Sequence, residues 1–174
     1  MAKVPVISVS TTVRPYDDPD KVAKALTTLF PDWVTTKLAD SESFPVTREP
    51  YEIGCEGCSP DTMVEALAQQ RILDTALDAM SMNIEKNTTW FLISRQAAIA
   101  SKVAFILEGE NPVGGIIHVE MESEDLASWI EEITWHPGRQ DIPREIGDEY
   151  SMSDDGEVTE WFDKKGQPTM NIEE

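Results

Sequence analysis

The first part of the chain alternates between strand-like and helix-like patterns of apolar residues. In residues 4–13, VPVISVSTTV, apolar side chains recur at every second position, as in a β-strand with one buried face. Residues 18–30 instead place apolar side chains three and four positions apart, after an Asp18-Pro19 pair that favours a helix start. The pattern then predicts a second strand at 33–40, WVTTKLAD, and a shorter one within 46–53.

The longest helix is expected at residues 59–83, and it is apolar on two sides. One side carries mainly large side chains, and the other carries smaller ones: Val64, Ala68, Ile72, Ala76 and Ala79. A helix of this kind must be covered on two sides. Because the sheet can cover only one, we expect a second helix or a partner subunit on the other, and predict a homodimer joined through this helix. Within it, Arg71 is expected to pair with the neighbouring Asp74 on the helix surface.

The remainder of the core predicts two further helices among short strands. TTWFLI at 88–93 is expected to be a strand, followed by a short helix that Ser94 caps. Strands are expected at 102–107 and 115–123, before a last helix that ends near Trp135. Helices interspersed with strands in this order predict an α+β fold, with a mixed sheet and helices packed mainly on one face.

The residue composition of the chain changes after Trp135. Residues 136–174 contain turn-forming residues throughout and many charges, which favours a partly disordered extension. Within it, EVTEWFDKKGQP at 157–168 is a candidate small hairpin. We therefore divide the chain into a single core domain, 1–135, and an acidic C-terminal extension, 136–174.

The chain is strongly acidic, with 14 basic and 33 acidic residues and a formal net charge of −19. Residues 1–135 hold ten basic and 22 acidic residues, a net charge of −12, and residues 136–174 hold four and 11, a net charge of −7. A phosphate backbone would be repelled unless the few cations gather. A salt-rich host cytoplasm, or a surface selected for solubility, would equally explain the acidity.

The N-terminal segment MAKVPVISVSTTVRP alternates instead of forming a continuous apolar block, which argues against a signal peptide. No apolar run is long enough for a membrane span. We expect a cytoplasmic protein that does not contact membranes.

Candidate catalytic and metal-binding residues are few. Cys55 and Cys58 form a CxxC pair, but zinc would need two further ligands, and His118 and His136 are not paired at ligand spacing. The pair is expected to be an incidental loop feature, with a redox dithiol as the alternative. Gly114-Gly115 opens a strand and does not precede a helix, so it does not form a phosphate-binding loop. We expect no cofactor, no metal and no enzymatic activity.

The cations are informative because they are scarce. Arg14, Arg95 and Lys102 all lie at expected junctions between strands and helices, so they can gather on one edge of the fold. Such an edge would contact phosphates despite the acidic total. Gln96 lies between them in sequence and can bond either a base edge or a neighbouring backbone carbonyl.

Four ordered motifs carry a family resemblance. VRPYDDPDKVAKALTTLFPD, RILDTAL, FLISRQAAIASKVAF and NPVGGIIHVEM together resemble the archaeal uncharacterised family UPF0201, over about residues 4–135. The resemblance implies a ribosomal-protein-L5-like fold and a dimer, and it suggests a role in RNA binding. Ser94-Arg95 stands where the family usually has Asn-Lys, which keeps the cation, and the acidic extension lies outside the shared pattern.

Two hypotheses for function follow. The first is a non-enzymatic protein that binds RNA or a ribonucleoprotein, such as ribosomal components, along an edge formed by Arg14, Arg95, Gln96 and Lys102. The alternative is an acidic protein-interaction module that meets a basic protein partner.

Overall fold

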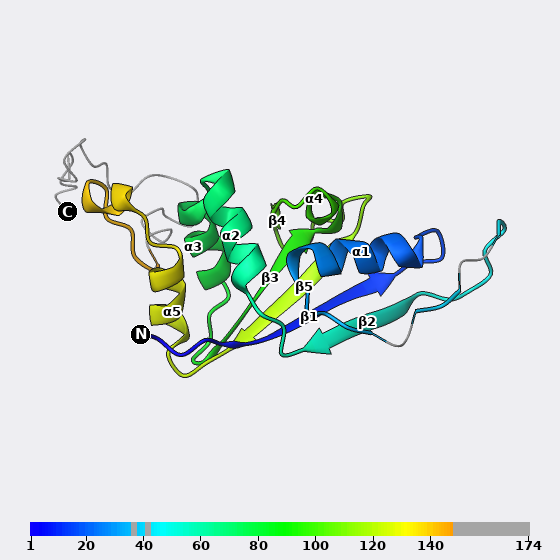
Figure 1. Ribbon diagram of the computed structural model, residues 1–174, viewed down its shortest axis with the longest axis horizontal. Coiled ribbons are helices and arrows are strands. Elements are labelled where there is room, and N and C mark those ends of the chain that lie inside the picture. Colours follow the sequence, from blue (N-terminus) through cyan, green and yellow to red (C-terminus); the bar gives the residue numbers. More distant parts are fainter. Residues whose placement is uncertain (36–37, 41–42, 148–174) are drawn as a thin grey trace, which may run out of the picture.

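The computed structural model describes residues 1–35, 38–40 and 43–147. Across these ranges the strands form a single five-stranded sheet in the order β2-β1-β5-β3-β4 (Figure 1). The strands are β1 (Val6–Val13), β2 (Tyr51–Glu56), β3 (Thr88–Ser94), β4 (Phe105–Ile106) and β5 (Ile116–Glu122). The expected mixed sheet is wrong, because every neighbouring pair of strands runs antiparallel.

The antiparallel arrangement follows from the connection between the first two strands. Val13, at the end of β1, faces Tyr51, at the start of β2. After α1 (Pro19–Leu29), the chain therefore returns to the end of the sheet where β1 finishes, instead of crossing over to run parallel.

The helices cover one face of the sheet. They are α1, α2 (Asp61–Gln70), α3 (Leu73–Ser81), α4 (Arg95–Ile99) and α5 (Leu126–Ile133), followed by a 3₁₀ turn at Pro137–Gln140. In Figure 1, α1 to α4 lie over the same side of the sheet, and α5 stands beside α3 near the N-terminus. No helix in the described ranges is long and apolar enough to cross a membrane.

The alternation along the strands sets which face is buried. Ile7 and Val9 of β1 and Ile117, Val119 and Met121 of β5 point into the core and are fully buried, as the period of two predicts. The intervening residues Ser8, Ser10, His118 and Glu120 lie on the opposite face and are half-buried or exposed. Among the residues that the structure describes, the sheet therefore has one covered face and one open face.

Several local predictions are confirmed. The side chain of Asp18 accepts hydrogen bonds from the Asp20 and Lys21 backbone N–H groups, and Pro19 is the first residue of α1. The Ser94 hydroxyl accepts from the Ala97 N–H at the start of α4. Both signals are local hydrogen bonds, which explains why they could be read from the sequence.

The expected strand at 33–40 is absent from the described parts of that range. Trp33 and Leu38 instead insert their side chains into the core from a loop. On one side β1 pairs with β2, which overlaps the short strand expected within 46–53 and includes Gly54 in its middle. The strand expected at 102–107 shortens to the two residues of β4.

The expected helix at 59–83 is two helices. Arg71 adopts a left-handed conformation, with φ 59° and ψ 40°, and ends α2. The N–H of Ile72 bonds the carbonyl of Leu67, which closes the last turn in the way that a glycine usually does. Because an arginine occupies this position, the sequence carries no signal for the break.

The beginning of the expected extension packs on the core. Arg139, in the 3₁₀ turn, is buried, and Ile146 packs against the apolar core. Arg144 donates to both carboxylate oxygens of Asp78 at 2.6 Å. Residues 136–147 are thus continuous with the domain that we had ended at 135, and the expected hairpin at 157–168 lies outside the described residues.

Candidate functional site

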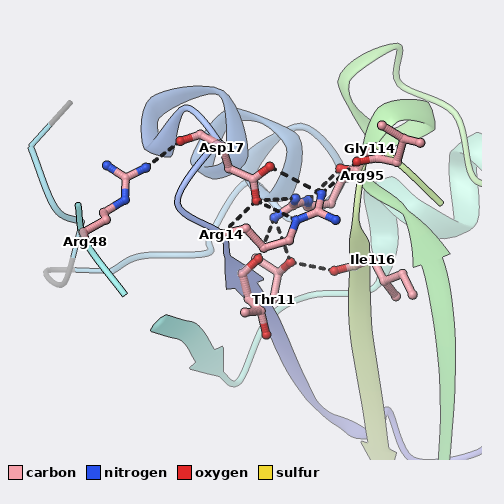
Figure 2. Close-up of polar contacts among 9 residues, drawn as sticks. Thr11, Arg14, Asp17, Arg48, Arg95, Gly114 and Ile116 are labelled. Carbon is pink, nitrogen blue, oxygen red and sulfur yellow. Dashed lines mark hydrogen bonds and ion pairs between the residues drawn. The ribbon is translucent and has the colours of Figure 1, made fainter. Parts of the chain in front are cut away.

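The first residue of α4 directs a charged side chain into the fold. Arg95 is 3% exposed and donates to the carbonyl oxygens of Gly114 and Thr12, each at 2.9 Å. A further N–H group bonds Oδ2 of Asp17 at 2.7 Å (Figure 2). A buried guanidinium requires partners of this kind, because an unpaired buried charge is strongly destabilising.

Asp17 is the acceptor at the centre of the cluster. Besides Arg95, it accepts from the Arg14 backbone N–H at 2.9 Å and from Arg14 Nε at 3.2 Å. Burial raises the pKa of this carboxyl, but the hydrogen bonds from Arg14 and Arg95 outweigh burial and hold the pKa below the ordinary value of 3.8. Asp17 is therefore an anion at neutral pH, matched by two guanidinium groups.

Arg14 and Arg48 complete the shell around Asp17. Arg14 is 26% exposed, donates to the Val113 carbonyl at 2.8 Å and lies over the ring of Tyr16 at 4.7 Å from its centroid. Arg48 donates to the backbone carbonyl of Asp17 at 2.6 Å (Figure 2). The cluster thus ties the end of β1 to α4, to the segment before β5 and to the segment before β2.

The Gly114-Gly115 pair makes room for this cluster. A Cβ atom on Gly115, which has a φ of +86°, would overlap the Arg95 guanidinium. One on Gly114 would meet Cβ of Gln96 at 2.9 Å. The two glycines therefore allow α4 to pack close to the start of β5. Sequence reasoning missed this role.

The four residues of the expected RNA-contacting edge have different environments. Arg14 and Arg95 do come together, at Asp17, but the expectation that Arg95 faces solvent beside Lys102 is corrected by its burial. Gln96 and Lys102 are exposed. No hydrogen bond or ion pair found among the described residues joins the Lys102 side chain to the cluster. Sequence reasoning missed Asp17, which lies 78 residues from its partner Arg95.

A second charged cluster joins α3 to the segment after α5. Asp74 bonds Nε2 of His136 and Nε of Arg139, each at 3.1 Å, instead of pairing with Arg71 as expected. Arg139 also donates to the Thr134 hydroxyl at 3.0 Å. Burial raises the pKa of Asp74, but the bonds from His136 and Arg139 outweigh it and lower the pKa. This cluster anchors residues that we had assigned to a loose extension.

The two cysteines are free thiols, Cys55 in β2 and Cys58 in the turn between β2 and α2. Cys58 is buried, and this burial, with the nearby Cys55 and Asp32, raises the pKa of its thiol to about 12. A thiol with so high a pKa is protonated at neutral pH and is a poor nucleophile. In the part of the chain that the structure describes, no three His, Cys, Asp or Glu side chains gather as a metal site would require.

Comparisons with known proteins place the chain among archaeal relatives, although no family model matches it. It is 29% identical over 142 residues to the "UPF0201 protein" of Methanothermobacter thermautotrophicus, covering 82% of this chain and 98% of the relative. It is 30% identical over 130 residues to that of Sulfurisphaera tokodaii, covering 74% and 86%. A crystal structure of a UPF0201 protein from Methanococcus jannaschii is similar, with a TM-score of 0.61 and 28% identity, over 75% of this chain and 99% of that chain.

The buried pair predicts a specific loss of stability. Asp17→Asn removes the charge that matches Arg95, so we expect the free energy of unfolding to fall by about 3 kcal/mol, as for a buried ion pair that loses one partner. Urea denaturation at pH 7, followed by circular dichroism, measures this change. The control is Asp18→Asn on the adjacent, exposed residue, which should cost less than about 0.5 kcal/mol because asparagine caps a helix as well as aspartate.

The same variants differ in their response to acid. Because the folded pKa of Asp17 lies below the unfolded value, near 3.8, the pair contributes its full stability above that pH. This contribution is lost as the pH falls through the folded pKa, so the difference between wild type and Asp17→Asn should shrink below about pH 4. An equal loss of stability in Asp17→Asn and Asp18→Asn, or a difference that does not depend on pH, would contradict the assignment.

Proposed function

This chain belongs to the UPF0201 family, and from that premise we propose that it is a non-enzymatic binding module whose acidic surface meets a basic protein partner. The proposal chooses between the two hypotheses drawn from the sequence on the basis of where the charges lie. A cytoplasmic place of action belongs to the same proposal and stays a prediction.

The observation that supports it is the use of arginines inside the fold. Arg14 and Arg95 pair with Asp17, Arg139 pairs with Asp74, and Arg144 pairs with Asp78. Each of these cations is paired with a carboxylate of the same chain, with Arg14 and Arg95 sharing Asp17, while the formal net charge of the chain is −19. A surface of this kind attracts a basic protein and repels a phosphate backbone.

RNA or ribonucleoprotein binding is the competing proposal. The family resemblance, with its expected likeness to ribosomal protein L5, and the exposed Gln96 and Lys102 support it. A depression of about 320 Å³ between α1 and α4 is lined by Lys21, Arg95 and Gln96, but also by Asp17 and Asp18. With Arg95 buried, this edge offers a phosphate less positive charge than the sequence suggested.

The non-enzymatic part of the proposal rests on the thiol chemistry. The CxxC pair was the candidate for a small redox enzyme, and the raised pKa of Cys58 opposes formation of the thiolate that such an enzyme needs.

A paired titration tests the proposal. The probes are a short peptide of alternating lysine and valine and a structured RNA hairpin, each fluorescently labelled and titrated with the full chain. We expect the peptide to bind, with an affinity that falls about tenfold between about 50 and 200 mM salt, because its attraction is electrostatic. A peptide of alternating glutamate and valine is the control and should not bind. Binding of the RNA hairpin with loss of affinity as salt rises, and no binding of the basic peptide, would contradict the proposal.

We also propose that two copies associate through α2 and α3, which replace the expected single helix. Val64 is half-buried and Ala68 is exposed, so the small-residue side of α2 is not fully covered within the chain. Sedimentation at micromolar concentration should give the mass of two chains for the wild type and for the control Gln69→Glu, and of one chain for Ala68→Glu. A wild-type monomer would contradict the dimer.

A further inference from the structure

The open face of the sheet carries a continuous row of uncharged side chains. The strand register places Gly54 beside Ser10, Ser10 beside His118, His118 beside Leu92, and Leu92 beside Ile106. This row crosses all five strands of the described sheet on the side that the helices leave uncovered (Figure 1).

Glutamates flank the row on both sides. The neighbouring row runs from Glu56 through Ser8 and Glu120 to Trp90, and Glu122 lies one row further. On the other side, Glu52 faces Thr12. All four glutamates are exposed, and the five described strands place no lysine or arginine on this face. Neighbouring carboxylates of this kind repel one another, and the repulsion is relieved when a cation binds between them.

The row also contains a hollow and an aromatic surface. Ser10, Thr12, Glu52, Ile116 and His118 line an open depression of about 350 Å³, beside the position where Gly54 contributes no side chain. Next to it, the rings of Trp90 and His118 stack, with centroids 5.7 Å apart and planes inclined by 14°. An indole ring of this kind can hold a lysine or arginine head group over its face.

We propose that the open face of the sheet binds an extended, basic segment of a partner protein. The basic side chains of the segment pair with Glu120, Glu122 and the two glutamates of β2. One of them lies against the Trp90–His118 stack, and the apolar side chains between them contact Leu92 and Ile116. This inference rests on the proposed function, since it specifies where on the acidic module the basic partner binds and that the partner binds as an extended segment.

The negative charge of the open face favours a basic segment over the other possible occupants, which are RNA, a second copy of the chain and residues 148–174. An RNA strand would meet four carboxylates on this face. A second copy placed face to face would set the same glutamates against each other, because a two-fold contact joins identical patches. Residues 148–174 of this chain hold nine acidic and two basic residues, so they are repelled as well.

The test compares two variants that lose equal charge. Glu120→Gln/Glu122→Gln alters the open face, whereas Glu65→Gln/Glu131→Gln alters exposed positions on α2 and α5. With the lysine–valine peptide at low salt, the first variant should bind about fivefold more weakly than the wild type. The second should change the affinity by less than about twofold, although both variants lose the same net charge.

A third variant tests the aromatic surface. Trp90→Met keeps a large apolar side chain and removes the ring, and it should also weaken binding of the peptide. Thermal unfolding of each variant, followed by circular dichroism, verifies that the sheet is intact before binding is compared.

The outcomes separate this inference from the proposed function. If the peptide binds the wild type and both double variants equally, the open face is not the site, while the acidic module stands. If the peptide does not bind the wild type, the module and this inference both fail. Binding of the RNA hairpin that Trp90→Met abolishes would assign the face to nucleic acid and overturn the inference.

Discussion

The ion pair between Arg95 and Asp17 is the interaction on which the arrangement of the fold depends. It lies where β1 ends, where α4 begins and where the chain enters β5, so three segments distant in sequence meet at one ion pair. A buried pair of this kind is stable only when its remaining hydrogen-bonding groups are also satisfied, and the carbonyls of Thr12 and Gly114 meet that condition. Gly115 leaves the space that the guanidinium occupies. The pair therefore acts as a geometric constraint that fixes α4 over the sheet.

This constraint has a consequence for the surface. When arginines hold the fold together from within, as Arg95 and Arg139 do, they are paired with carboxylates there and the excess of carboxylates is left outside. The same chain thus combines buried arginines with a surface rich in carboxylates. The open face of the sheet shows the arrangement most clearly, since its glutamates surround an uncharged row that crosses every described strand.

Features that depend on neighbouring residues could be predicted from the sequence. The alternation in β1, the Asp18-Pro19 start of α1 and the Ser94 cap of α4 are all local, and the structure confirms them. Features that depend on distant partners could not. Nothing near Arg95 in sequence indicates that its side chain pairs with Asp17. The left-handed position that ends α2 is occupied by Arg71 instead of the glycine that usually marks a helix end. The strand expected at 33–40 is absent from the described part of that range, where Trp33 and Leu38 imitate a strand while they pack against the core from a loop, and β2 overlaps the shorter strand expected within 46–53.

The candidate site shows the same limit. Its four residues were chosen as cations and a polar neighbour at expected junctions, and the junctions of α4 are where they were expected. Whether a side chain at a junction points inward or outward depends on the space left by the opposite segment, here Gly115, which the sequence pattern does not reveal.

The central claim is that the cations serve the fold while the acidic sheet face serves the partner. Two-dimensional NMR of the uniformly ¹⁵N-labelled full chain, titrated separately with the lysine–valine peptide and the RNA hairpin, tests it most directly. The account predicts that the peptide shifts the amide signals of Ser10, His118 and Glu120 and the indole N–H signal of Trp90, while the RNA shifts none of them. Shifts confined to Arg14, Gln96 and Lys102, produced by the RNA and not by the peptide, would contradict it.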